Sequence, residues 1–235
     1  MRIRIIFLAV FFLCASFASS FQNIKNLSLS AEGIEKLEID CGAGFLKVYG
    51  IESLREIEVT AEIVVEGKNE KRAQEFISEN VKLDLEKRGS KAVLVSKIKQ
   101  GFSLFSFRKK VINLTVNVPK NIDLDIDDSS GAMNIESIIG QVDIDDSSGS
   151  IHVENIRGNV TIDDSSGGID VEDISGDISI DDSSGSIYIT NIGENVTLSD
   201  GSGSINIDGV GGDVILKEDG SGRVKIRNVK GKVIR

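Results

Sequence analysis

The chain has 235 residues, which is room for one large domain or two small ones. It carries 27 Lys and Arg against 37 Asp and Glu, a formal net charge of −10, and a surface of that sign repels nucleic-acid phosphates. Trp is absent and Tyr occurs twice, so the aromatic platforms common in sugar-binding clefts are scarce. The composition therefore argues against DNA or RNA as a partner and disfavours carbohydrate binding.

Residues 1–20 have the pattern of a secretory signal peptide. Arg2 and Arg4 give a basic start, residues 5–14 an apolar core, and residues 15–20 a cleavage zone of small residues. The apolar run is shorter than the roughly 20 residues of a spanning helix, so membrane contact is expected only if this segment stays uncleaved as an anchor. The sequence predicts an exported protein of the periplasm or of the extracellular cell surface.

Once the signal segment is removed, Cys41 is the only cysteine. An internal disulfide is then impossible, and stability must come from packing. Leu13 stands where a bacterial lipoprotein signal usually has a small residue, so we do not expect Cys14 to carry a lipid.

Residues 21–120 are predicted to form a β-rich region with a small α+β elaboration. Residues 37–50 overlay residues 142–155 of a later repeat, which places Cys41 on Asp146 and Gly44 on Gly149. A strand over 56–65 and one short helix over 69–80 follow. Next come a hairpin turning at 88–90 and a loop with three phenylalanines (Phe102, Phe105 and Phe107). A strand over 111–119 follows and ends at Pro119, the only proline.

Residues 121–235 contain six copies of one repeat, and this self-similarity is the dominant signal. In the unit at 140–157, Val142 and Ile144 alternate with polar residues, then Ile151 and Val153 do the same. Two such segments around a Ser/Gly turn indicate two short strands per unit. The turn glycines recur at spacings of 18, 18, 18, 18 and 19 (Gly131, Gly149, Gly167, Gly185, Gly203 and Gly222).

Short strands of this kind are stable only when copies stack, about 4.8 Å apart, so that each coil completes the hydrogen bonds of the next. The sequence therefore predicts an all-β, right-handed parallel β-solenoid with about 18 residues per coil. Its handedness follows from the general preference for right-handed parallel crossovers. The expected division is 1–20 signal peptide, 21–120 N-terminal region with the first coil and the helix, and 121–235 solenoid.

Each turn reads D-D-S-S-G or a variant, and the second Asp and fourth-position Ser occur in all six units (Asp128, Asp146, Asp164, Asp182, Asp200 and Asp219; Ser130, Ser148, Ser166, Ser184, Ser202 and Ser221). Alternation predicts that Asp146 points inward while Asp145 and Ser147 point outward. Under a structural interpretation the inward Asp accepts backbone N–H groups in an Asx-turn. Under a functional interpretation the stacked carboxylates bind Ca²⁺. The constancy of the inward Asp favours the structural interpretation.

Charge is divided between the two regions. Residues 21–120 hold 17 basic against 14 acidic side chains, and residues 121–235 hold 8 against 23. The last unit carries a basic cluster that could cap the stack and drive head-to-tail self-association (Arg223, Lys225, Arg227, Lys230, Lys232 and Arg235). The acidic solenoid is compatible with cations or basic protein surfaces.

Catalytic chemistry is not expected. The single histidine, His152, is predicted on an outward strand position, where an exposed histidine is usually solvated. Cys41 is expected to be a small buried residue at a coil corner. The sequence has neither the His/Cys spacing of a zinc site nor a phosphate-binding loop of the G-x-x-x-x-G-K-[ST] type. We therefore predict no catalytic, cofactor-binding or metal-binding residues, and no cofactor.

The combination of a signal peptide, Val118–Pro119 and repeated I-D-x-S-S-G-x-I-x-V resembles the bacterial putative-adhesin domain family of unknown function. The resemblance rests on residues 126–131, 144–149, 162–167 and 180–185, and it covers nearly all of 30–235. It implies a parallel β-solenoid and an envelope or surface location, and it supplies no catalytic residues.

The sequence thus predicts a non-catalytic, exported, adhesin-like binding or scaffolding protein of the cell envelope. Its expected partner is an unknown protein or cell-surface component, with self-association as a further possibility. Two alternatives stay open, a Ca²⁺-dependent binding module and a polysaccharide-active β-helix enzyme.

Overall fold

The computed structural model describes residues 19–67, 69–99, 107 and 109–235. The predicted signal peptide falls outside these residues except for Ser19 and Ser20, which begin the first strand. Phe102 and Phe105 of the predicted phenylalanine loop also lie outside them.

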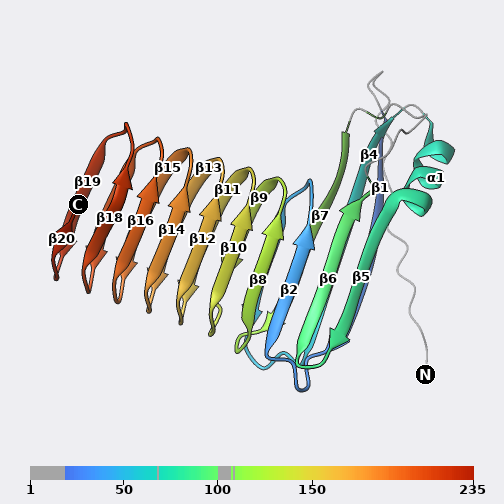
Figure 1. Ribbon diagram of the computed structural model, residues 1–235. Helices are drawn as coiled ribbons and strands as arrows, with labels where there is room; N and C mark the ends of the chain where they lie inside the picture. Colours follow the sequence, from blue (N-terminus) through green and yellow to red (C-terminus); the bar gives the residue numbers. More distant parts are fainter. Residues whose placement is uncertain (1–18, 68, 100–106, 108) are drawn as a thin grey trace.

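The chain coils through two facing ten-stranded sheets, as the row of stacked turns in Figure 1 shows. In spatial order, sheet A contains β1 (Ser19–Ser30), β4 (Glu56–Gly67), β7 (Lys109–Pro119), β3 (Leu46–Ile51), β9 (Gly131–Glu136), β11 (Gly149–Ile156), β13 (Gly167–Ile174), β15 (Gly185–Ile192), β17 (Ile205–Val210) and β19 (Val224–Val229). Sheet B contains β5 (Val81–Arg88), β6 (Lys91–Ile98), β2 (Lys36–Cys41), β8 (Asp123–Asp128), β10 (Val142–Asp146), β12 (Val160–Asp164), β14 (Ile178–Asp182), β16 (Val196–Asp200), β18 (Val214–Asp219) and β20 (Val233–Ile234).

Successive coils pair in parallel and in the register that the repeat predicts. Val142 lies beside Val160, Ile144 beside Ile162, and Gly149 beside Gly167. The alternating apolar residues are buried between the sheets, and β-branched side chains suit this pleated interior because their rotamers are restricted. The predicted all-β parallel solenoid of about 18 residues per coil is confirmed.

Most sheet A strands of the solenoid contain one residue with positive φ that interrupts the alternation. In β11 this residue is Asn155, with φ 57°, and it brings Ile156 back to the buried side after the outward Glu154. Equivalent positions in the other units also have positive φ (Ser137, Asp173, Asn191, Gly209 and Asn228). Asn, Asp and Gly tolerate the left-handed region best, which explains the composition of this position.

The N-terminal region completes one end of the stack. β2 and β3 form the degenerate first coil, placed beside β8 and β9 as predicted. The expected strand, hairpin and helix appear as β4, β5–β6 and α1 (Glu70–Asn80), and Asn69 caps the helix by accepting the backbone N–H of Arg72. Phe76 of α1 packs against Phe107, with ring centroids 5.1 Å apart.

Both sheets continue across the predicted boundary at residue 120, because β2 and β3 of the first region pair with strands of the second. Beyond β7 in sheet A and β6 in sheet B the pairing changes from parallel to antiparallel, β7 with β4, β4 with β1 and β6 with β5. This end of the molecule is therefore built differently from the repeats.

Candidate functional site

The inward aspartates of the turns form a buried column. We call Asp128, Asp146, Asp164, Asp182 and Asp200 the inner aspartate column, and each is 0–2% exposed. In four of the five, Oδ1 accepts the backbone N–H of the Ser two residues later, at 3.2, 3.0, 2.9 and 2.9 Å along the chain. Asp128 instead accepts from Ser129 at 2.8 Å. The predicted inward position and Asx-turn role are both confirmed in these five coils, whereas Asp219 of the last unit is only partly buried.

The second carboxyl oxygen is different. Oδ2 of every residue in the inner aspartate column is buried and has no hydrogen-bond partner. Two unit charges about 4.8 Å apart repel by roughly 3–4 kcal/mol at an effective dielectric of 20, so a fully ionised column is costly. Burial accordingly raises the pKa of all five carboxyls, and neighbouring aspartates help raise that of Asp146 and of Asp182 to about 6.

Cys41 begins this column, as the overlay of the first coil predicts. Its thiol is 4% exposed and donates to Oδ1 of Asp128 at 3.3 Å. Burial is the main cause that raises the pKa of the Cys41 thiol, and Asp128 adds to it. A buried thiol of raised pKa is a poor nucleophile, so the structure gives Cys41 a packing role.

A second column lies on the solvent side of sheet B. We call Asp127, Asp145, Asp163 and Asp181 the outer aspartate column, since all four are exposed and pair in register from coil to coil. Among the described residues, no Lys or Arg forms an ion pair with Asp145, Asp163 or Asp181. The outer aspartate column is therefore a straight row of carboxylates, spaced about 4.8 Å apart, that a partner can reach.

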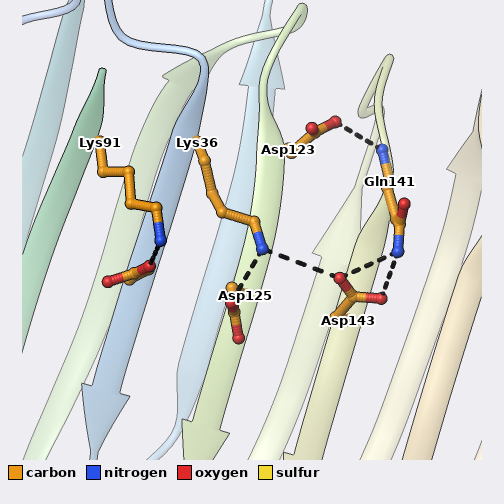
Figure 2. A network of polar contacts seen from close by, with 7 residues as sticks. Lys36, Lys91, Asp123, Asp125, Gln141 and Asp143 are labelled. Atoms are coloured by element: carbon orange, nitrogen blue, oxygen red, sulfur yellow. Dashed lines mark hydrogen bonds and ion pairs between the residues drawn. The ribbon is translucent and has the colours of Figure 1, made fainter. Parts of the chain in front are cut away.

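Among the described residues, the ion pairs between lysines and the carboxylates of sheet B lie near its N-terminal end. Figure 2 shows Lys36 of β2 reaching Asp125 at 2.9 Å and Asp143 at 3.9 Å. Gln141 extends the network, because its side-chain amide donates to Asp143 at 2.8 Å and its backbone N–H donates to Asp123 at 2.8 Å. The hydrogen bond to Asp125 is the main cause that raises the pKa of Lys36. Lys97 forms a further ion pair with Asp40.

His152 lies outward on β11, as predicted. Its Nδ1 is 3.4 Å from Oδ2 of Asp170 on the next coil, and its Nε2 is 3.6 Å from Oε2 of Glu154. No serine or cysteine nucleophile is among these contacts, so this geometry is a partly exposed polar contact on sheet A. Within the described ranges, no cluster of three or more His, Cys, Asp and Glu side chains is arranged to hold a metal ion.

Basic side chains gather at the opposite end of the stack. The six basic residues of the last unit are all exposed on and beside β19 and β20, the final strands of the two sheets (Arg223, Lys225, Arg227, Lys230, Lys232 and Arg235). Arg227 pairs with Asp208 at 2.9 Å. In the part of the chain that the structure covers, α1 is the single helix, and it is neither long nor apolar enough to cross a bilayer.

No protein-family model matches the chain, and no curated protein matches it significantly. Solved structures do resemble it. A putative cell adhesion protein from Clostridium sporogenes is 16% identical, with 92% of this chain and 98% of that chain covered and a TM-score of 0.38. A putative adhesin from Bacteroides fragilis is 10% identical (90% and 96% covered, TM-score 0.45), and one from Parabacteroides distasonis is 14% identical (91% and 96%, TM-score 0.45).

These structures carry the same kind of name as the family that the sequence resembles.

Proposed function

We propose that this chain is a non-catalytic, exported protein of the cell envelope that acts as an adhesin-like binding or scaffolding module. Its binding face is the solvent side of sheet B, and its partner is a protein or cell-surface component with a cationic surface. The observation that supports this most directly is the outer aspartate column, an exposed carboxylate row that over three coils forms no ion pair with any Lys or Arg that the structure describes.

Sheet A is a less uniform surface. The row that contains Glu136, Glu154 and Glu172 continues into Thr190 and Asp208, and the row beside it mixes His152 with Asp170, Tyr188 and Asn206. A repeated charge on a rigid sheet presents a fixed spacing to a partner, which favours a matching row of cations. Chemistry that needs a few different groups around one point is not favoured by such repetition.

The test compares two triple variants of equal charge change. One carries Asp145→Asn, Asp163→Asn and Asp181→Asn on sheet B, and the other carries Glu136→Gln, Glu154→Gln and Glu172→Gln on sheet A. Binding of a lysine-rich oligopeptide is measured by calorimetry at low and at physiological salt. We expect the sheet B variant to bind on the order of tenfold more weakly than the unmodified protein, because each replaced carboxylate removes one exposed ion pair with the peptide. The sheet A variant should bind within about twofold of the unmodified protein.

An equal loss of affinity in both variants would mean that total charge alone attracts the peptide, and it would contradict a specific face on sheet B.

The two alternative functions have tests of their own. Melting with Ca²⁺ and with chelator tests the Ca²⁺-dependent module, since a ligand that binds the folded state raises the melting temperature. A glycan-cleavage screen tests the polysaccharide-active enzyme.

Export and self-association belong to the same proposal. Cell fractionation with and without residues 1–20 tests whether this segment directs the chain out of the cytoplasm. Contact between the basic end of one copy and the acidic sheet of another would be weakened by salt. Light scattering should then show oligomers at low ionic strength, and a monomer under those conditions would remove this part of the proposal.

A further inference from the structure

The unpartnered oxygens of the inner aspartate column are the least explained polar atoms in the described structure. Five Oδ2 atoms in five successive coils are buried without a donor, and the coils are held in register by parallel pairing. Buried polar atoms are nearly always hydrogen-bonded, so a fivefold repeat of the same exception calls for a ligand.

The surroundings of these oxygens restrict what that ligand can be. Oδ2 of Asp182 lies 3.1 Å from where a Cβ on Gly185 would stand, so the oxygen faces the column of turn glycines. The nearest N–H groups are already taken by Oδ1 or by the neighbouring coil. The carboxyl groups of adjacent coils, one coil spacing of about 4.8 Å away, act electrostatically on Asp146 and Asp182.

We propose that the inner aspartate column is a proton-binding site, in which carboxyl groups of adjacent coils take up protons from solution when the chain folds and share them along the stack. A protonated carboxyl is a donor as well as an acceptor, so an Oδ2–H can donate to the next carboxyl. The same protons remove the repulsion between buried charges. The site involves only the inward face and does not depend on the proposed binding at the outer aspartate column.

The charged and titratable groups around the column agree with this assignment. Asp128 faces the Cys41 thiol and Lys97, which makes it the only member with a nearby cation among the described residues. Asp146 faces Asp128 and Asp164. Asp182 faces Asp164, Asp200 and the outward Asp181. Acidic neighbours disfavour ionisation, so protons are held most firmly at Asp146 and Asp182.

The sign of the pH dependence follows from these pKa values. Asp146 and Asp182 have a pKa of about 6 in the folded chain, above the ordinary value of 3.8. The folded state therefore binds more protons than the unfolded state between these two values. Stability should rise as the pH falls through 6, level off near the unfolded pKa, and be lost as the pH rises again through 6.

The experiment compares Asp146→Asn with Asp145→Asn, which remove the same charge from adjacent residues on opposite faces of β10. Asn mimics a protonated carboxyl, because its oxygen can accept from Ser148 and its NH₂ can donate along the column. In denaturant titrations at about pH 8, Asp146→Asn should raise the folding equilibrium constant at least about tenfold, and the gain should shrink at about pH 5. Asp145→Asn should change it by less than about twofold at either pH.

Infrared spectroscopy gives a second readout that does not depend on stability. At about pH 5, below the folded pKa of about 6 of Asp146 and Asp182, the unmodified protein should show the carbonyl band of protonated carboxylic acid, and this band should weaken in a chain with both Asp146→Asn and Asp182→Asn. A cation in place of protons would make Asp146→Asn destabilising at pH 8 and would make the melting temperature depend on whether sodium, calcium or choline is the salt. Either result, or the lack of the carboxylic-acid band, would overturn the proposal.

Discussion

At the turn glycines the coils approach one another too closely for any side chain. A Cβ on Gly167 would stand 1.5 Å from the carbonyl oxygen of Gly149, and the φ of Gly167 is 150°, a value that L residues rarely adopt. The neighbouring Gly168 lies in open strand, where a Cβ would meet only the carbonyl oxygen of Ser186 at 3.9 Å. Two adjacent glycines thus have different reasons to be there.

Gly167→Ala should lower the free energy of unfolding by about 3 kcal/mol or more, because the added methyl group forces adjacent coils apart. Gly168→Ala is the matched control and should stay within about 0.5 kcal/mol, since it adds the same methyl group at an exposed position. Denaturant unfolding of both variants measures the difference. Equal losses would mean that the coil contact at Gly167 is looser than the structure has it.

Residue positions were largely predictable where the repeat could be compared with itself. Alternation predicted that Asp146 points inward and Asp145 outward, and the structure agrees. The overlay predicted the place of Cys41 beside the column, and its contact with Asp128 agrees. The unpartnered Oδ2 atoms were not predictable, because a sequence pattern shows which side of a strand a residue faces but not which of its atoms find donors.

Among the elements, the sheet A strands depend on one left-handed residue per coil. Asn191 has a φ of 57°, its side-chain amide donates to Asp173 of the preceding coil at 3.0 Å, and Ile192 after it is buried. Without this kink Ile192 would point to solvent, since side chains alternate along a regular strand.

Asn191→Val should destabilise the protein by about 1–3 kcal/mol, because a β-branched residue is strained in the left-handed region. Asn191→Gly loses the same side-chain hydrogen bond but adopts this conformation freely, so it isolates the effect of the backbone. We expect the glycine variant to be clearly more stable than the valine variant in thermal unfolding. The reverse order would contradict the assigned conformation.

The sequence held a signal for this kink that alternation alone does not interpret. Small or polar residues recur at the same place in six units. Strict alternation would turn the apolar residue that follows, such as Ile156, toward solvent. β1 was also not predicted as an element. Its inward positions include Phe21, Leu27 and Leu29, but Asn23 and Lys25 interrupt them, and Ile24 is 64% exposed. A strand at a sheet edge needs less apolar alternation because one side of it is open to solvent.

At the scale of the whole molecule, acidic and basic side chains are distributed unevenly along the axis of the stack. Exposed carboxylates run along the outer aspartate column, and the basic residues gather near β19 and β20. The fold class and the coil length followed from the period of the repeat, because only stacked coils complete the hydrogen bonds of such short strands. Of the N-terminal strands, β4, β5, β6 and β7 were predicted as elements, but their order in the two sheets depends on long-range pairing that no local pattern reports.

The proposals for both columns require successive turns to lie directly over one another. Spin labels at positions 127 and 163 and at positions 127 and 199, in a Cys41→Ser chain, test this by electron paramagnetic resonance. These positions lie two and four coils apart in one row of sheet B. The second distance should exceed the first by roughly 10 Å, two coil spacings, with narrow distributions. Distances that do not grow with the number of coils between the labels would contradict the in-register stack.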